Sequence, residues 1–300
     1  MQNSQLSLTY KMYMKTLLFF LLPILSLGQT MYKGTVIDKL TKEKVPFATV
    51  GLIKANTGIN ADDAGSFTLL VANNDNSDTL IISCIGYQTV KVPVNDMPFD
   101  NRFYLVKKEN ILEEVVIGKR NYDKSITLNE LSGCGNNYYG TMGYISQVAQ
   151  HFISPVENSF LSEIRMCTLG EKCIFRIRVY DMDMKTGQPS NDLVDSVIEI
   201  KSGKRQVRID VEPYKIQIPG KDFFVALEWL KIPYNERHLM VDSNGIKKPH
   251  LEYNPLVGKN DWKIESTGNN TEIWHQNYKG KWENFFRKNS QLLISAKVKY

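Results

Sequence analysis

The chain has 300 residues, of which 42% are hydrophobic and 23% charged, a balance typical of folded globular domains and unlike that of disordered chains. This length is enough for about two domains with separate cores. The formal net charge is only +5, with basic and acidic residues mixed along the chain, so composition gives no reason to expect a nucleic-acid-binding surface.

The N-terminal segment has the pattern of a secretory signal peptide. Lys11 and Lys15 precede an apolar run over residues 16–27, and small residues lie just before Gln29, where we expect cleavage. The run has about twelve residues, fewer than the roughly twenty that a membrane-spanning helix needs, and an uncleaved anchor is the alternative. We therefore expect an exported protein, periplasmic, outer-membrane-associated or extracellular, with no transmembrane segment after removal of residues 1–28. Translation has three candidate starts, Met1, Met12 and Met14.

Residues 30–118 form a series of short apolar runs separated by turn residues. Several runs alternate with a period of two, as strands with one buried face do, and Gly65 supplies a turn before one of them. Seven short strands at this spacing predict a Greek-key β-sandwich. The expected strands are 32–38, 45–52, 66–69, 79–85, 88–94, 103–106 and 112–117.

Several motifs in these strands follow the order found in one known family. They are Gly34 with Val36, the series Pro46, Ala48, Val50 and Leu52, Gly65 with Phe67 and Leu69, Ile82-Ser83 before Gly86-Tyr87, and Leu112 to Val116. In these residues the chain resembles the carboxypeptidase regulatory-like domain, in the version abundant in exported Bacteroidota proteins. The resemblance implies a transthyretin-like sandwich of the carbohydrate-binding-like fold, without peptidase chemistry. In that family an outer-membrane transport barrel often follows, but the rest of this chain is too short to form one.

A second domain is expected after a polar linker. Residues 119–137 are rich in polar and turn residues, and short apolar runs resume in residues 138–300. About eight strands in this second part predict a jelly-roll-like β-sandwich. The expected fold class is therefore all-β throughout.

Two strands of the second domain have the clearest patterns. The run at 175–180 alternates between apolar residues, expected inside, and Arg176 and Arg178, expected outside. The run at 223–230 is apolar on both faces except at Glu228, so we expect it to be a central strand.

The four cysteines give one disulfide hypothesis. Export permits disulfides, and Cys167 and Cys173 flank a turn-like stretch that would bring them together in a hairpin. The alternative is that both are small buried apolar residues at strand ends. Cys84 lies in an apolar run and is expected in the core, and the spacing of the four, including Cys134, fits no zinc module.

Two acidic residues before a turn are a weak calcium candidate. Asp181 and Asp183 alternate ahead of Gly187, and carboxylate oxygens are ligands that calcium prefers. Because the further acids of a calcium loop are missing and Lys185 lies inside the stretch, a solvated loop is the favoured interpretation. We expect no other metal site and no cofactor.

No catalytic motif is evident. The histidines form no His-Glu-x-x-His zinc motif, and the chain has no Gly-x-Ser-x-Gly elbow and no Gly-rich phosphate loop. We therefore expect a protein that is not an enzyme. A hydrolase whose site lies in the second domain is the alternative, because catalytic residues can be scattered in sequence. The histidines are His151, His238, His250 and His275.

Aromatic residues near the C-terminus are the candidate ligand contacts. Trp274, Tyr278 and Trp282 flank a turn-like stretch, with Trp262 nearby in sequence, and exposed rings on a sandwich stack on sugar faces or protein side chains. The alternative is that Trp274 and Trp282 pack as a cross-strand pair. The sequence thus predicts a non-catalytic exported binding or envelope-assembly protein with a protein or glycan partner, and a glycan-binding lectin-like protein is a further alternative.

Overall fold

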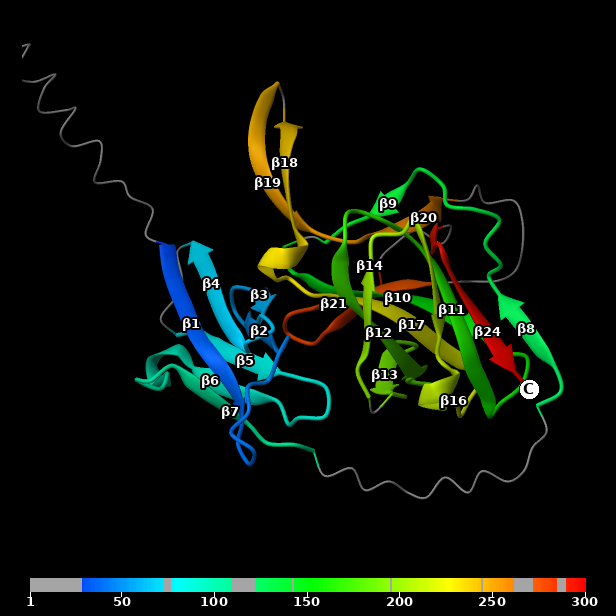
Figure 1. Cartoon of the computed structure of the whole chain (residues 1–300), viewed down its shortest axis with the longest axis horizontal. Coiled ribbons are helices and arrows are strands. Elements are labelled where there is room, and N and C mark those ends of the chain that lie inside the picture. Colours follow the sequence, from blue (N-terminus) through cyan, green and yellow to red (C-terminus); the bar gives the residue numbers. More distant parts are fainter. Residues whose placement is uncertain are drawn as a thin grey trace, which may run out of the picture.

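The computed structural model describes residues 29–72, 77–108, 122–141, 143–194, 196–243, 245–261, 272–284 and 290–300. In these ranges the regular structure consists of β-strands and a few short 3-10 helices, which confirms the all-β fold class. The described part of the chain has no helix that is long and apolar enough to cross a membrane. Two groups of strands lie side by side, the first in blue and cyan and the second in green to red (Figure 1).

The first sandwich consists of a three-stranded and a four-stranded sheet. Alternate residues such as Phe67 and Leu69 point into a shared core, while Thr68 and Leu70, which alternate with them, are exposed. The three-stranded sheet has the order β4 (Ser66–Ala72), β1 (Gln29–Asp38), β7 (Arg102–Leu105). The four-stranded sheet has the order β3 (Thr57–Asn60), β2 (Thr49–Leu52), β5 (Thr79–Ser83), β6 (Val90–Pro93), and η2 (Val94–Asp96) follows β6.

The second sandwich is larger and buries its core between a seven-stranded and an eight-stranded sheet. The first of these has the path β13 (Pro189–Asp192), β12 (Cys173–Met182), β17 (Asp222–Trp229), β10 (Ile145–Ile153), β21 (Ile273–Asn277), β22 (Trp282–Asn284), with β14 (Ile198–Ser202) beside β12. The other has the path β23 (Ser290–Leu292), β20 (Leu256–Asp261), β11 (Ser159–Leu169), β24 (Ile294–Lys299), β8 (Ser125–Leu128), with β15 (Gln206–Asp210), β16 (Gln217–Ile218) and β9 (Tyr138–Tyr139) off this path.

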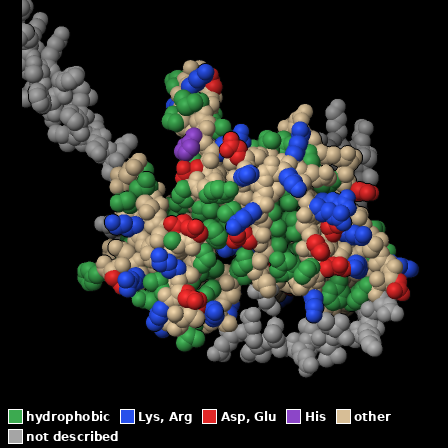
Figure 2. Space-filling view, in the orientation of Figure 1, with side chains coloured by type: hydrophobic (Ala, Val, Ile, Leu, Met, Phe, Trp, Pro, Cys, Tyr) green, Lys and Arg blue, Asp and Glu red, His purple; other side chains and the backbone are tan. Residues whose placement is uncertain are grey.

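A two-stranded ribbon projects from the second sandwich. It consists of β18 (Glu236–Ser243) and β19 (Ile246–Tyr253), and the 3-10 helix η4 (Pro233–Asn235) leads into it, while η3 (Glu212–Tyr214) lies elsewhere, after β15. Figure 2 shows the ribbon standing clear of the body, with hydrophobic side chains on its surface.

The two strands with the clearest sequence patterns lie where expected. β17 is central, between β12 and β10, and its side chains Val225 and Leu227 are fully buried in the sandwich core. The outer face of the same sheet carries Arg176, Arg178 and Glu228, and this face points toward the first sandwich.

Two segments differ from the expectation, and a third, the predicted strand at 112–117, lies outside the described residues. The first sandwich contains β3, which the sequence did not suggest because the run 57–60 contains a glycine and little apolar alternation. Residues 125–128, which we expected within the linker 119–137, form β8 and pair with β24 at the edge of the second sandwich.

The two sandwiches are docked through a few close contacts. Asn60 and Lys231 exchange hydrogen bonds: the Asn60 amide donates to the Lys231 carbonyl (3.1 Å), and the Lys231 amide donates to Asn60 Oδ1 (2.8 Å). Phe47 of the first sandwich packs with Leu230 and Ile232 of the second.

Tyr278 completes this contact. Its ring lies against a cross-strand pair of glycines, Gly51 and Gly58, and a Cβ atom at Gly58 would lie 2.3 Å from Tyr278 Cδ1. Both positions are therefore occupied by glycine for a structural reason: the ring takes the space of a side chain.

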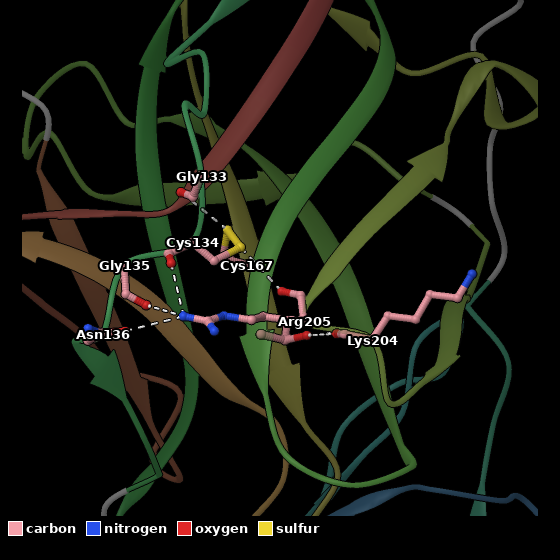
Figure 3. The surroundings of a disulfide bond; sticks show 8 residues. Gly133, Cys134, Gly135, Asn136, Cys167, Lys204 and Arg205 are labelled. Atoms are coloured by element: carbon pink, nitrogen blue, oxygen red, sulfur yellow. Dashed lines mark hydrogen bonds between the residues drawn. A yellow bond between two sulfur atoms is a disulfide. The ribbon is translucent and has the colours of Figure 1, made fainter.

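The disulfide differs from the pair that we expected. Cys167 is bonded to Cys134 (Figure 3), with a Cα–Cα distance of 5.4 Å. Cys173 is buried with a free thiol. The reason is that Cys167 lies near the end of β11 and Cys173 begins β12, and these strands belong to opposite sheets. Arg205 supports the bonded segment by donating to the carbonyls of Cys134 and Gly135, each at 3.0 Å.

Candidate functional site

A polar cleft of about 560 Å³ lies between the two sandwiches. Residues of the first sandwich that line it lie on β2, on β5 and the loop that follows β5, and after β7. Others lie on β10, β12, β13, β17, β21 and the β21–β22 turn. Thus the cleft exists only because the two sandwiches are docked. Its wall on the first sandwich includes Thr49, Ser83, Gly86, Tyr87, Thr89 and Lys108.

An arginine held by two acids lies at the wall formed by the second sandwich. Arg178 Nε donates to Asp192 Oδ2 (2.6 Å), and its Nη1 donates to Glu228 Oε2 (3.3 Å). The side chains of Arg178, Asp192 and Glu228 are 16%, 21% and 6% exposed. Burial alone would lower the pKa of Arg178, but the negative charges of Glu228 and Asp192 raise it, so the guanidinium stays protonated. Burial raises the pKa of Asp192, and Arg178 opposes this shift.

A second arginine lines the cleft without a carboxylate partner. Arg176 is only 3% exposed; its Nη1 donates to the Phe47 carbonyl (3.2 Å), and its guanidinium lies 5.6 Å from the centre of the Phe47 ring. Among the described residues, Arg176 makes no ion pair, and its buried Nε has no acceptor. A buried cation in this state is costly unless another group supplies the missing interaction.

Hydrogen bonds between side chains fix the remaining wall. Tyr180 Oη donates to Gln147 Oε1 (2.9 Å), and Gln147 Nε2 donates to Gln276 Oε1 (2.9 Å). Burial raises the pKa of Tyr180, so this hydroxyl keeps its proton. The wall therefore presents ordered amide and hydroxyl groups and is suited to hold a polar ligand without rearranging.

The aromatic candidates do not form one exposed surface. Trp274 is partly buried on β21, Trp282 is 8% exposed with its ring edge-on to Tyr180 (5.4 Å between centres), and both belong to one apolar cluster. Tyr278 is 4% exposed and lies between the sandwiches. Trp262 lies outside the described residues.

The two calcium candidates are engaged in local hydrogen bonds. Asp181 accepts from the backbone amide and the side chain of Asn191 (2.6 and 3.0 Å), and Asp183 accepts from the Lys185 amide (2.8 Å). The bond from the Lys185 amide lowers the pKa of Asp183. Among the described residues, no three side chains of His, Cys, Asp or Glu are grouped to hold a metal ion.

The sequence predicts only part of the cleft. Strand alternation places Arg176 and Arg178 on the outer face and makes Glu228 the exception in an apolar strand, but no sequence pattern connects the three. No motif points to Asp192 or Gln147. The available signal was a carboxylate inside a buried strand, which requires a cationic partner on the neighbouring strand.

The first sandwich is similar to a known family. Residues 32–117 match the CarboxypepD_reg-like domain. The match to the CarboxypepD_reg-like domain agrees with the resemblance of the strand motifs and covers less than half of the chain. No curated protein sequence matches this chain.

A solved structure with partial similarity is that of the cysteine protease and lectin-like domains of Cwp84, a surface layer associated protein of Clostridium difficile. The chains are 12% identical with a TM-score of 0.36, and the match covers 80% of this chain and 48% of that one. This chain thus spans about half the length of that structure, and similarity at this level gives no information on ligand or activity.

Proposed function

We propose that this chain is a non-catalytic, exported binding protein of the cell envelope, and that its ligand enters the cleft between the CarboxypepD_reg-like domain and the second sandwich. The observation that carries the proposal is the group Arg178, Asp192 and Glu228, which places three ionisable side chains at the wall of an interdomain cleft. Export is inferred from the signal-like pattern of residues 1–28.

Buried charges are rarely retained for stability alone. An apolar set of similar volume usually stabilises a fold as well as a buried ion group does. Charged residues that converge in a cleft with shifted pKa values therefore mark candidate ligand sites. Here the cleft is also preformed, because docking contacts and the Tyr180–Gln147–Gln276 hydrogen bonds fix its walls.

The same geometry supports binding over glycan hydrolysis. Most glycoside hydrolases need one carboxyl group free to donate a proton and a second free to act as base or nucleophile. In this cleft, Asp192 and Glu228 both accept hydrogen bonds from Arg178. A glycan ligand is the second candidate within the binding class, favoured by the amide and hydroxyl groups of the cleft wall.

A bulky side chain at the cleft tests the proposal. Thr89 is exposed and lines the cleft, so Thr89→Trp should fill part of it, whereas Gln88→Trp changes an adjacent exposed residue that does not line it. We expect glycans or peptides that bind the full chain, screened by calorimetry, to lose affinity for Thr89→Trp and keep it for Gln88→Trp. Binding that neither variant weakens would contradict the proposed site.

A further inference from the structure

We infer that the cleft recognises a sugar unit that carries a carboxylate, as a uronic acid does. This inference rests on the proposed function and names the ligand class of the same cleft. It is drawn from the charge that the cleft leaves unbalanced and from the polar groups around that charge.

The basic side chains of the cleft differ in whether they have carboxylate partners. Arg178 already has two carboxylates, Asp192 and Glu228, so it needs no negative ligand. Arg176 has none among the described residues, and the exposed side chain of Lys108 lines the opposite wall. Together with Arg178, three cations therefore line the cleft against two acids, and one ligand carboxylate would balance the remaining positive charge.

The rest of the wall fits a hydroxyl-rich body. Ser83 and Thr49 come from the first sandwich, and Ser146, Gln147 and Gln276 come from the second. Amide and hydroxyl side chains both donate and accept hydrogen bonds, which suits the vicinal hydroxyls of a sugar. Apolar peptide side chains would instead require apolar subsites, and polar residues predominate in the lining of this cleft.

The experiment compares matched ligands. Oligosaccharides of galacturonate, glucuronate and mannuronate are titrated into the full chain beside their methyl esters, which keep the sugar body and lose the charge. Trialanine, with a free carboxyl terminus, is a third arm. We expect at least one acidic oligosaccharide to bind about tenfold more tightly than its ester, as for a charge-assisted hydrogen bond.

Variants of the two cations test their role. Arg176→Gln and Lys108→Ala should each weaken binding of the acidic ligand about tenfold and weaken binding of the ester less, because the ester keeps a carbonyl acceptor but loses the charge. Lys107→Ala is the control, because Lys107 is exposed, does not line the cleft and lies 3.7 Å from Asp38. Lys108 is on the surface, so its variant remains informative if Arg176→Gln does not fold.

The outcomes separate this inference from the proposed function. Equal binding of acid and ester, or preference for trialanine, overturns the sugar-acid inference but leaves the cleft as the site if Thr89→Trp abolishes that binding. Absence of binding by every acidic oligosaccharide also overturns the inference. If Thr89→Trp weakens the binding of none of the ligands in any arm, the result contradicts the proposed function as well.

Discussion

At the residue scale, Lys231 is the most unusual charge in the fold. It is 3% exposed, its Nζ donates to the Gly143 carbonyl (2.9 Å), and it lies 4.8 Å from the centre of the Tyr278 ring. Burial lowers its pKa to about 7. Near neutral pH the docking contact therefore includes a lysine that loses its proton readily.

This pKa predicts how stability depends on pH. Between about pH 7 and the ordinary lysine pKa, the unfolded chain binds a proton that the folded chain has released, so the free energy of unfolding rises with pH. From pH 7 to 8.5 we expect a rise of about 1 kcal/mol per pH unit from this residue. Lys231→Met should abolish the rise, as measured by urea denaturation at several pH values. An unchanged slope in the variant would contradict the assignment.

Gly58 gives a second prediction at this scale. A methyl group there would lie 2.3 Å from Tyr278 and 2.6 Å from the Val50 carbonyl, so Gly58→Ala must displace the docking ring or the strand. We expect a loss of about 2 kcal/mol in unfolding free energy. Gly220→Ala is the control, because no atom lies within 4 Å of a Cβ at that position. Equal denaturation midpoints for the two variants would argue against this contact.

Individual residues also show what the sequence could and could not predict. The outward positions of Arg176 and Arg178 followed from strand alternation, and the position of Glu228 followed from its place in an apolar run. The burial of these side chains could not be predicted in this way, because a strand pattern shows which face a side chain is on and does not show what covers that face. The burial of Tyr278 was likewise not predictable, since its partners Gly51 and Gly58 lie far away in sequence.

At the scale of elements, the long apolar strands were predictable and the short polar ones were not. β12 and β17 have enough alternation or continuous apolar character to be recognised. β8 has no buried residue and is a strand only because β24 offers a free edge. The predicted pairing of Cys167 with Cys173 was wrong because it also depends on how strands are arranged in space. Closeness of the two cysteines in sequence does not predict which sheet each strand joins.

The disulfide holds the segment before β9 against β11. Closing a loop with a sequence separation of 33 residues should stabilise the fold by about 3 to 4 kcal/mol in the chain-entropy model. We expect Cys134→Ser with Cys167→Ser to lower the unfolding free energy by this amount, and Cys84→Ser to have a smaller effect.

Peptide mapping checks this pairing directly. Digestion without reduction should yield a linked pair of peptides that contain Cys134 and Cys167. A linked pair that contains Cys167 and Cys173 would show that the pairing in the structure is wrong.

At the scale of the whole molecule, two separate cores are joined by few contacts. The cores of the two sandwiches share no residue, and the contact between them depends on Phe47, Asn60, Lys231 and Tyr278. No local pattern encodes such docking, because these residues are scattered along the sequence. The all-β class and the resemblance of the first domain were predictable, whereas the cleft was not.

Export is a prediction about the whole molecule that the fold does not test. If residues 1–28 are a signal peptide, the protein recovered from the periplasm of an expressing bacterium should begin at Gln29 by intact mass. Recovery of the uncleaved chain in the membrane fraction would instead support the anchor.

The central claim is that ligand binding involves both sandwiches at once. Hydrogen–deuterium exchange of the full chain, with and without whichever acidic sugar, ester or peptide binds most tightly, measures this directly. The account predicts slower exchange on binding both at residues 83–86 of the first sandwich and at residues 190–192 and 276–280 of the second. Protection confined to one sandwich, or to surfaces outside the cleft, would contradict it.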